Sequence, residues 1–352
     1  MSIAALFSVG LVILSSASGG ESQYVFGNIY GYLQHQLIYG VGLGLIGGFI
    51  FYFLPYKILH SLALPFYLTS LFLLILIFVP GFAYAAGGAQ RWIHIGSFLM
   101  QPSEITKLTF VIYLAAWFAS KKNEVQNIGT GLVPFTILVG MLAFFLFLQP
   151  DISTLILIGL TAGFMYIVAG GKIQHFAFLG VLGVIGLFIL IQIAPYRLER
   201  ISTFLNPQTD PMGISYHLNQ ALLAEGSGGL WGVGIAQGQQ SHNFLPEPMG
   251  DSIFAVWSEE TGFVGAISLI LLFLIFIWRG LKIARDSNDR FSSMLALGIT
   301  SWIGIQAFIN IGSITGVLPL MGIPLPFISY GGSAMVSTLA ASGLLLQISR
   351  HN

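Results

Sequence analysis

The chain has 352 residues, of which 55% are hydrophobic and only 7% are charged, whereas a soluble domain carries about 25% charged residues. This composition excludes a water-soluble globular protein. The 13 Lys and Arg residues balance the 13 Asp and Glu residues, and without a basic run the chain offers no surface for nucleic acid. The absence of cysteine excludes disulfides, thiol nucleophiles and Cys-ligated metal centres.

The hydropathy pattern predicts an all-α integral membrane protein. A helix needs about 20 mainly apolar residues to cross the bilayer, and clusters of Pro, Gly and charged residues divide the sequence into ten such segments. The first segment lacks the basic start and the cleavage site of a signal peptide, so we expect it to be a retained span. We expect one polytopic domain over 1–352, with a long hydrophilic loop at 195–251. The predicted spans are 2–18, 34–54, 60–80, 104–120, 131–149, 152–170, 173–194, 252–278, 292–315 and 328–349.

The distribution of cations predicts the orientation. With ten spans and a cytoplasmic N-terminus, nine of the 13 Lys and Arg residues face the cytoplasm, as the positive-inside rule requires. Both termini are then cytoplasmic, and the loop 195–251 is extracytoplasmic. The longest cytoplasmic loop, about 279–291, is too short for a nucleotide-binding domain, and the phosphate-loop pattern is absent. The nine cations are Lys57, Lys121, Lys122, Lys172, Arg279, Lys282, Arg285, Arg290 and Arg350.

Ionisable residues near the outer ends of spans are functional candidates, because a charge at a helix centre in the membrane costs roughly 2.5–3.5 kcal/mol. Glu104 and Lys107 are three residues apart on one helical face, which fits either a cavity or an intrahelical ion pair. The full set comprises Arg91, Glu104, Lys107, Asp151, Arg197, Arg200, Asp251, Glu259 and Glu260.

Three of the acidic candidates also fit structural roles. Asp151 follows Pro150 at a tight turn, where it fits a helix cap as well as a cavity residue. Glu259 and Glu260 are adjacent and therefore about 100° apart around a helix. They cannot both face one cavity, so we expect one of them to pair structurally with a cation or with backbone donors.

The loop 195–251 concentrates the polar side chains. Asp251 ends this loop at the mouth of span 8, where a helix cap is the alternative to a chemical role. Arg197 and Arg200 offer positive charge for phosphate, and amides such as Gln240 offer hydrogen bonds for sugar hydroxyls. His217 and His242 show no metal-ligand spacing, so we interpret them as solvated or hydrogen-bonding loop residues.

Two apolar segments carry unusual glycine or proline spacing. Pro319, Pro324 and Pro326 forbid a continuous helix through 310–333, and irregular backbone at membrane depth must be buried in protein or line a wet cavity. We therefore predict a broken or re-entrant segment before span 10. In span 2, Gly40, Gly44 and Gly48 recur every four residues, which indicates a helix-packing seam.

Ordered motifs along nearly the whole chain resemble the SEDS family (shape, elongation, division and sporulation), with a slight lean to its FtsW branch. Any one motif alone is weak, but their number and order make a chance match improbable. The motifs are Gly-Gly-Ala-Gln-Arg-Trp-Ile at 87–93, Gln-Pro-Ser-Glu at 101–104, Gln-Pro-Asp at 149–151, Arg-Ile-Ser-Thr-Phe-Leu-Asn-Pro at 200–207, Leu-Pro-Glu at 245–247, Asp-Ser-Ile-Phe-Ala at 251–255, Glu-Glu-Thr-Gly-Phe at 259–263, and Pro-Leu-Pro-Phe-Ile-Ser-Tyr-Gly-Gly-Ser at 324–333.

The resemblance implies a ten-span glycosyltransferase of the bacterial cytoplasmic membrane. It would polymerise lipid II into peptidoglycan strands on the outer face, for cell division or elongation, beside a class B penicillin-binding protein that crosslinks the product. The essential Asp of the family matches Asp251. The common family pattern Pro-Glu-x-His-Thr-Asp-Phe reads Pro-Glu-Pro-Met-Gly-Asp-Ser at 246–252, so Ser252 replaces Phe. This departure bears on the subfamily and the shape of the loop.

The resemblance also implies roles for the other candidates. Asp251 would be the general base on the acceptor sugar hydroxyl. Glu247 and Gln240 are candidate substrate contacts. Whether a divalent cation, Mg²⁺ or Mn²⁺, assists is open. The cations that would stabilise the departing undecaprenyl pyrophosphate are Arg91, Lys107, Arg197 and Arg200.

Two other classes of protein fit some of these features. A lipid II transporter would use a similar cavity and broken helix, but it needs access from both sides and usually has two repeated halves, and no repeat is visible. A noncatalytic scaffold of the cell-wall synthesis complex would not need Asp251.

Overall fold

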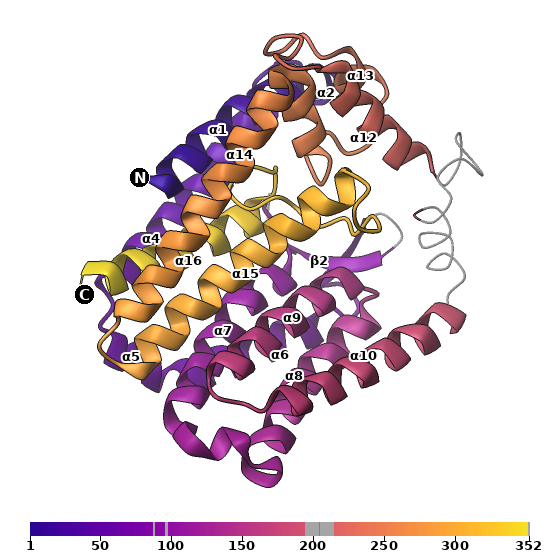
Figure 1. The fold of residues 1–352 in the computed structure, drawn as a ribbon. Helices are drawn as coiled ribbons and strands as arrows, with labels where there is room; N and C mark the ends of the chain where they lie inside the picture. Colours follow the sequence, from indigo (N-terminus) through magenta and orange to yellow (C-terminus); the bar gives the residue numbers. More distant parts are fainter. Residues whose placement is uncertain (87–88, 96–97, 194–203, 205–214, 351–352) are drawn as a thin grey trace. The chain divides into compact units, whose positions relative to one another are not determined.

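The computed structural model describes residues 1–86, 89–95, 98–193, 204 and 215–350 (Figure 1). Helices dominate the described residues, and one small antiparallel sheet interrupts them. The elements are α1 (Ser2–Ala17), α2 (Gly19–Phe26), α3 (Gly31–His35), η1 (Gln36–Gly42), α4 (Leu43–Phe53), α5 (Tyr56–Ser61), α6 (Ala63–Leu76), β1 (Ala83–Ala86), β2 (Ala89–Ile95), β3 (Phe98–Met100), α7 (Pro102–Lys121), η2 (Lys122–Gln126), η3 (Ile128–Leu132), α8 (Val133–Leu148), α9 (Ile152–Val168), α10 (Ile173–Ile193), α12 (Tyr216–Ser227), α13 (Gln239–Asn243), α14 (Ile253–Asp286), α15 (Arg290–Ile314) and α16 (Gly332–Arg350).

The predicted all-α membrane fold is confirmed, because each of the ten predicted spans coincides with a helix or a continuous run of helical turns. Among the described residues, five helical stretches are long and apolar enough to cross a membrane unaided. A sixth is added if α1 and α2, which are bent by 61° relative to each other, form one span. The broken segment before the last span is also confirmed, since residues 315–331 form neither helix nor strand.

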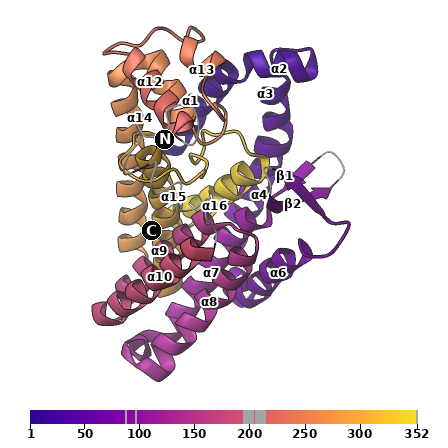
Figure 2. The ribbon, with the colours of Figure 1, turned by 90° about the vertical axis from the view of Figure 1, so that its right-hand side faces the viewer.

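The structure corrects the sequence analysis in two places. The cytoplasmic loop predicted at 279–291 is largely helix, because α14 continues to Asp286 and α15 begins at Arg290. The predicted span ended at the first charged residues. A helix can continue through charged residues beyond the membrane, because their side chains are solvated there. The second difference is the three-stranded sheet β1-β2-β3, whose antiparallel hairpin of β1 and β2 is visible in Figure 2.

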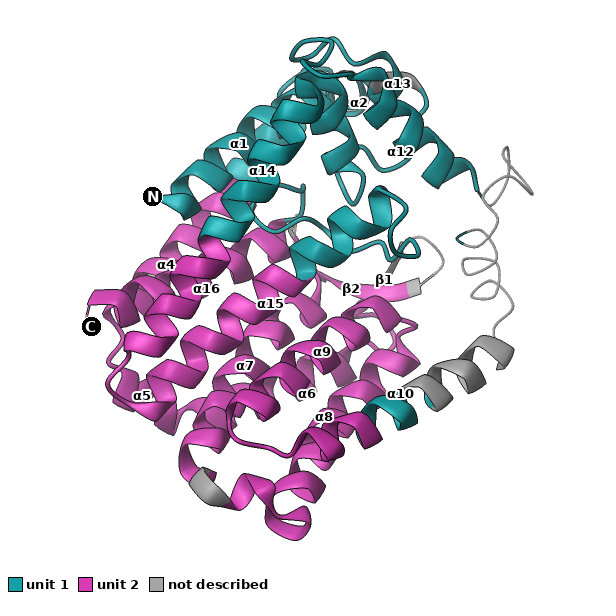
Figure 3. Cartoon of the chain, viewed as in Figure 1, with its two compact units in different colours: residues 1–37, 179–275, 306–331 teal, residues 38–178, 276–305, 332–352 magenta. Residues whose placement is uncertain are grey.

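The chain forms two compact units that interleave along the sequence (Figure 3). The first unit comprises residues 1–37, 179–275 and 306–331, and the second comprises 38–178, 276–305 and 332–352. The expectation of one polytopic domain stays a prediction. The first unit contains Asp251 and the broken segment, and the second contains Arg91, Glu104, Lys107 and Asp151.

Glycines form the predicted packing seam in the second unit, where α4 packs against α16. A Cβ atom added to Gly343 would lie 2.1 Å from the backbone oxygen of Gly48, and one added to Gly48 would lie 2.9 Å from the backbone oxygen of Leu339. Both distances are shorter than van der Waals contact. The two helices therefore approach so closely because neither glycine carries a side chain.

Helix α14 is broken at Gly262, and a glycine-rich loop of the first unit fills the break. Gly262 has φ 70° and ψ −168°, a conformation that L side chains rarely adopt. The break frees backbone groups, and the loop satisfies them: the N–H groups of Val233 and Gly234 donate to the carbonyls of Glu259 and Glu260, each at 3.0 Å. A Cβ atom on Gly232 would lie 2.1 Å from the Glu260 carbonyl. The glycines of this loop thus permit close backbone packing.

Candidate active site

Asp251 lies in a turn whose backbone is held by the broken segment of the first unit. Three successive carbonyls of this turn accept hydrogen bonds from residues 310–330. The N–H of Tyr330 donates to Met249 at 2.8 Å, the Ser329 hydroxyl donates to Gly250 at 2.7 Å, and the Asn310 amide donates to Asp251 at 2.8 Å. The position of Asp251 therefore depends on residues about 60 to 80 positions further along the chain.

Asn310 joins the helix, the broken segment and the turn. Its Nδ2 atom also donates to the carbonyl of Ile323 at 2.7 Å, and its side chain is only 1% exposed. The prolines of the segment prevent a helical hydrogen-bond ladder, so this carbonyl needs a side-chain donor. The single amide group of Asn310 thus donates to two backbone carbonyls, those of Asp251 and Ile323.

The carboxylate of Asp251 remains reachable although its backbone is fixed. Its side chain is 15% exposed. A Cβ atom on Gly322 would lie 3.7 Å from Oδ2, so the broken segment passes directly beside the carboxylate. Helix α14 begins at Ile253, one residue beyond Ser252, whose hydroxyl donates to Pro246 at 2.8 Å. This arrangement suits a general base in a partly dehydrated site.

Glu247 lies close enough to Asp251 for their charges to interact. Partial desolvation raises the pKa of Glu247 above its usual range, the negative charges of Asp251 and Glu21 add to this, and His217 opposes them. Glu247 also adopts a positive φ of 48°, and its carbonyl accepts the N–H groups of Gly250 and Ser252 at 3.0 and 3.3 Å. The fold therefore brings together two residues that the sequence analysis named separately as site candidates.

Glu259 and Glu260 both have structural partners. Glu259 accepts the backbone N–H groups of Gln240 and Ser241 at 2.9 and 2.8 Å, at the start of α13. Glu260 accepts the N–H of Ala236 at 3.1 Å and the hydroxyl of Ser16. The side chains are 1% and 2% exposed. We expected one of these residues to pair structurally, and both do. Together they hold the loop that precedes Asp251.

In the second unit, Arg91 holds the turn that ends at Asp151. Its guanidinium donates to the carbonyl of Gln149 at 3.1 Å and to that of Pro150. Asp151 caps α9 by accepting the N–H of Thr154 at 3.3 Å, which confirms the capping interpretation of this residue. At least two of the five Arg91 donor groups are thus engaged with backbone carbonyls.

Lys107 and Glu104 form the intrahelical ion pair that the spacing allowed. Lys107 Nζ lies 2.7 Å from Glu104 Oε1, and the two side chains are 2% and 4% exposed. The ammonium also lies over the ring of Trp302, 5.4 Å from its centroid. A buried ion pair with additional contacts leaves neither charge isolated in a low-dielectric environment.

The structure gives less information on the remaining predicted site residues and on the metal. Arg197 and Arg200 lie outside the described residues. Gln240 is partly buried, and its backbone N–H serves Glu259. The part of the chain that the structure describes contains no group of three or more His, Cys, Asp or Glu side chains that could hold a metal ion.

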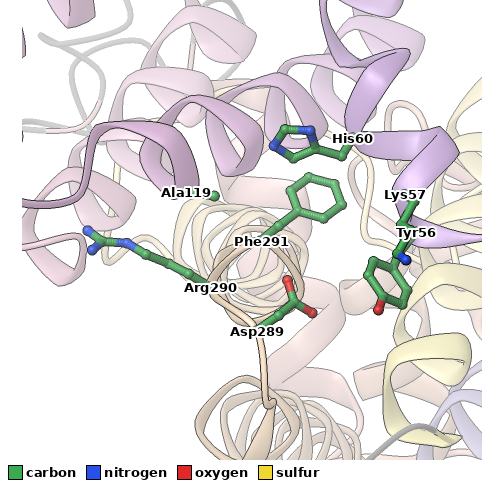
Figure 4. A pocket seen from close by; sticks show the side chains of 7 residues that line it. All are labelled: Tyr56, Lys57, His60, Ala119, Asp289, Arg290 and Phe291. Atoms are coloured by element: carbon green, nitrogen blue, oxygen red, sulfur yellow. The ribbon is translucent and has the colours of Figure 1, made fainter.

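A cavity of about 420 Å³ in the second unit has no residue in common with the predicted site. Figure 4 shows the Phe291 ring between His60 and Asp289. The Phe291 and His60 rings form an edge-to-face contact, with their centroids 5.0 Å apart. The Arg290 guanidinium points away from the Phe291 ring and donates to Ala169 at 2.9 Å. The lining residues are Tyr56, Lys57, His60, Ala119, Asp289, Arg290 and Phe291.

Sequence analysis did not identify the side chains that hold the Asp251 turn, because Asn310 and Ser329 were only parts of an apolar segment. His217 was expected to be a solvated or hydrogen-bonding loop residue, and its hydrogen bond with Ser252 meets that expectation. The available signal was Asn310 itself, because an amide inside an apolar helix needs partners in the protein. Which backbone groups it serves depends on long-range contacts that no local pattern encodes.

The fold and the site define a helical, multi-pass membrane protein with an acidic residue held beside a broken helical segment. The sequence model of the FtsW/RodA/SpoVE family, described as a cell cycle protein, matches residues 1–352. The chain therefore belongs to this family. Stage V sporulation protein E of Bacillus subtilis is 39% identical over 99% of this chain and 94% of that protein. The probable peptidoglycan glycosyltransferase FtsW of Coxiella burnetii is 38% identical over 97% of this chain and 93% of that protein.

Solved structures show the same fold. A chain of a peptidoglycan synthase complex that coordinates polymerization and crosslinking matches with a TM-score of 0.80 and 27% identity, over 99% of this chain and 96% of that chain. The rod shape determining protein RodA of Thermus thermophilus matches with a TM-score of 0.70 and 27% identity, over 99% and 94%.

Glu225 on α12 is a second perturbed carboxyl group in the loop 195–251. Burial raises its pKa to about 7, and its Oε1 atom is buried without a hydrogen-bond partner among the described residues. Because the folded pKa exceeds the unfolded value, protonation favours the folded state. The resulting stabilisation is present below about pH 4.5 and is lost as the pH rises through about 7.

We expect Glu225→Gln to stabilise the protein in a pH-dependent way, because the amide stays neutral where the parent must ionise a buried acid. The difference in Tm between variant and parent, measured in detergent, should grow as the pH rises from about 5 to about 8. Asp286→Asn, at an exposed position, is the matched control and should show no such trend. A difference that is constant with pH would contradict the burial of this group.

Proposed function

We propose that this chain is a peptidoglycan glycosyltransferase that polymerises lipid II at the outer face of the bacterial cytoplasmic membrane. The observation that carries the proposal is the carboxylate of Asp251, which is reachable while three consecutive backbone carbonyls around it are held. Family membership and the relatives named as glycosyltransferases support the same activity.

In the proposed reaction, Asp251 takes the proton of an acceptor sugar hydroxyl as that oxygen attacks the anomeric carbon of the donor. The new glycosidic bond forms while the bond from the anomeric carbon to the pyrophosphate breaks. Undecaprenyl pyrophosphate leaves with the bonding electrons, and cationic side chains stabilise its charge. Arg197 and Arg200 are our candidates for this role because they belong to the same loop, and Arg91 and Lys107 stay predictions beside them.

Glu247 and Gln240 are proposed substrate contacts. A Glu247 carboxyl with a raised pKa donates a hydrogen bond to a sugar oxygen when protonated and accepts one when ionised. A divalent cation, Mg²⁺ or Mn²⁺, stays a prediction.

We expect Asp251→Asn to slow polymerisation strongly without unfolding the protein. The purified chain, incubated with lipid II with and without a class B penicillin-binding protein, should produce glycan polymer. The variant should lose about 10²-fold or more in rate, the typical contribution of a general base, while its Tm stays close to that of the parent. Asp286→Asn, on the exposed end of α14, should leave the rate unchanged.

Two results of this assay would contradict the proposal. Polymerisation that survives Asp251→Asn would remove this residue from the general-base role. A parent that moves lipid II between leaflets and makes no polymer in either arm would identify a transporter.

We propose that the partner is a class B penicillin-binding protein, whose membrane helix packs on α14. Leu271, Leu274 and Ile275 present an apolar face there and are 46% to 53% exposed. The similarity to a chain from a complex that couples polymerization to crosslinking supports this choice. The two arms of the lipid II assay test whether the partner affects the rate.

We also propose that both termini are cytoplasmic and that the loop 195–251 is extracytoplasmic. The native chain has no cysteine, so single cysteines can be labelled without background. An impermeant thiol reagent added to intact spheroplasts should label a cysteine at the exposed Gln237 and should not label one at the exposed Asn288. The reverse pattern would overturn the orientation.

A further inference from the structure

His217 on α12 lies against both Ser252 and Asp251. Its Nε2 atom is 2.6 Å from the Ser252 hydroxyl oxygen and 3.8 Å from Asp251 Oδ1. The His217 side chain is 24% exposed, and Ser252 is fully buried. One ring nitrogen therefore faces a buried hydroxyl and the candidate catalytic carboxylate together.

The hydrogen bond of Ser252 determines which His217 nitrogen carries a proton. A serine hydroxyl has one hydrogen, and that of Ser252 is donated to the carbonyl of Pro246 at 2.8 Å. A carbonyl oxygen only accepts, so toward His217 the hydroxyl oxygen must act as the acceptor. It follows that Nε2 bears the hydrogen in both the neutral and the cationic imidazole.

This proton places positive charge beside Asp251. The Nε2–H group is the positive end of a dipole in neutral His217, and the ring gains a full charge as the pH falls. The surrounding carboxylates act in the opposite direction, since both Asp251 and Glu21 raise the pKa of Glu247 whereas His217 lowers it. The titratable groups in this cluster are His217, Asp251, Glu247, Glu21, Tyr32, Tyr330 and His35, whose Nδ1 atom lies 3.0 Å from the Tyr330 hydroxyl.

We propose that His217 is a positioning residue for Asp251: its imidazole, whose Nε2–H is fixed by Ser252, keeps the carboxylate 3.8 Å away ionised through its positive charge. The inference rests on the proposed glycosyltransferase function, because it concerns how the general base is held ready. His217 does not take the proton itself, since its Nε2 atom already carries one. Asp251 must be ionised to accept the proton of the sugar hydroxyl, and the positive group beside it favours that state over a wider pH range.

The test measures lipid II polymerisation rate against pH for the parent, His217→Gln and His217→Ala. We expect the acid midpoint of the profile to rise in the order parent, Gln, Ala, by about one pH unit for His217→Ala. The ratio of the His217→Ala rate to the parent rate should then be about tenfold lower on the acid limb than at high pH. Gln retains an N–H donor without a titratable charge, so it should lie between the two.

A matched control and Tm measurements separate this role from a structural one. His94→Gln removes an exposed imidazole from β2 of the second unit and should leave the profile unchanged. A loss by the same factor at every pH in both His217 variants, or unchanged profiles, would overturn the positioning role. If the parent makes no polymer at any pH, the proposed function itself fails and this inference fails with it.

Discussion

The hydrogen bonds between the Asp251 turn and the broken segment are the constraint on which the site depends. Backbone groups outside helices must find partners where water is scarce, and both stretches are irregular. Asn310 provides a hydrogen-bond donor to both stretches, since its amide donates to the carbonyls of Asp251 and Ile323 at 2.8 and 2.7 Å. Ser329 accepts the N–H of Leu325 and donates to Gly250, each at 2.7 Å. The requirement to satisfy backbone groups thus fixes the carboxylate in place.

The same requirement separates structural from chemical carboxylates. The break of α14 at Gly262 exposes backbone groups that the preceding loop covers, and Glu259 and Glu260 bind the N–H groups of that loop. These two side chains are almost completely buried. Asp251, eight residues before Glu259, remains 15% exposed. The site therefore contains two buried structural acids beside two acids that a substrate can reach, Asp251 and the exposed Glu247.

Local patterns predicted much of this arrangement. Hydropathy located the ten predicted spans, each of which coincides with helix, and the prolines indicated the broken segment, because both properties are read from short stretches of sequence. Asp251 was predicted from its place at the end of the loop and from the family resemblance. The pairing of His217 with Ser252 and the role of Asn310 were not predictable, since each depends on residues that are 35 to 59 positions apart. The hairpin of β1 and β2 was not predicted.

The most direct test of the central claim compares Asn310→Ala with Gln306→Ala. Gln306 also lies on α15, is also buried, and donates to Pro324 of the broken segment at 2.8 Å, whereas the Asn310 amide donates to the Asp251 carbonyl itself. Both variants leave buried carbonyls without a donor, at a cost of about 1–3 kcal/mol each. If the Asn310 amide positions Asp251, Asn310→Ala should lose on the order of 10²-fold in lipid II polymerisation rate, and Gln306→Ala should lose far less. Equal rates for two folded variants would contradict the claim.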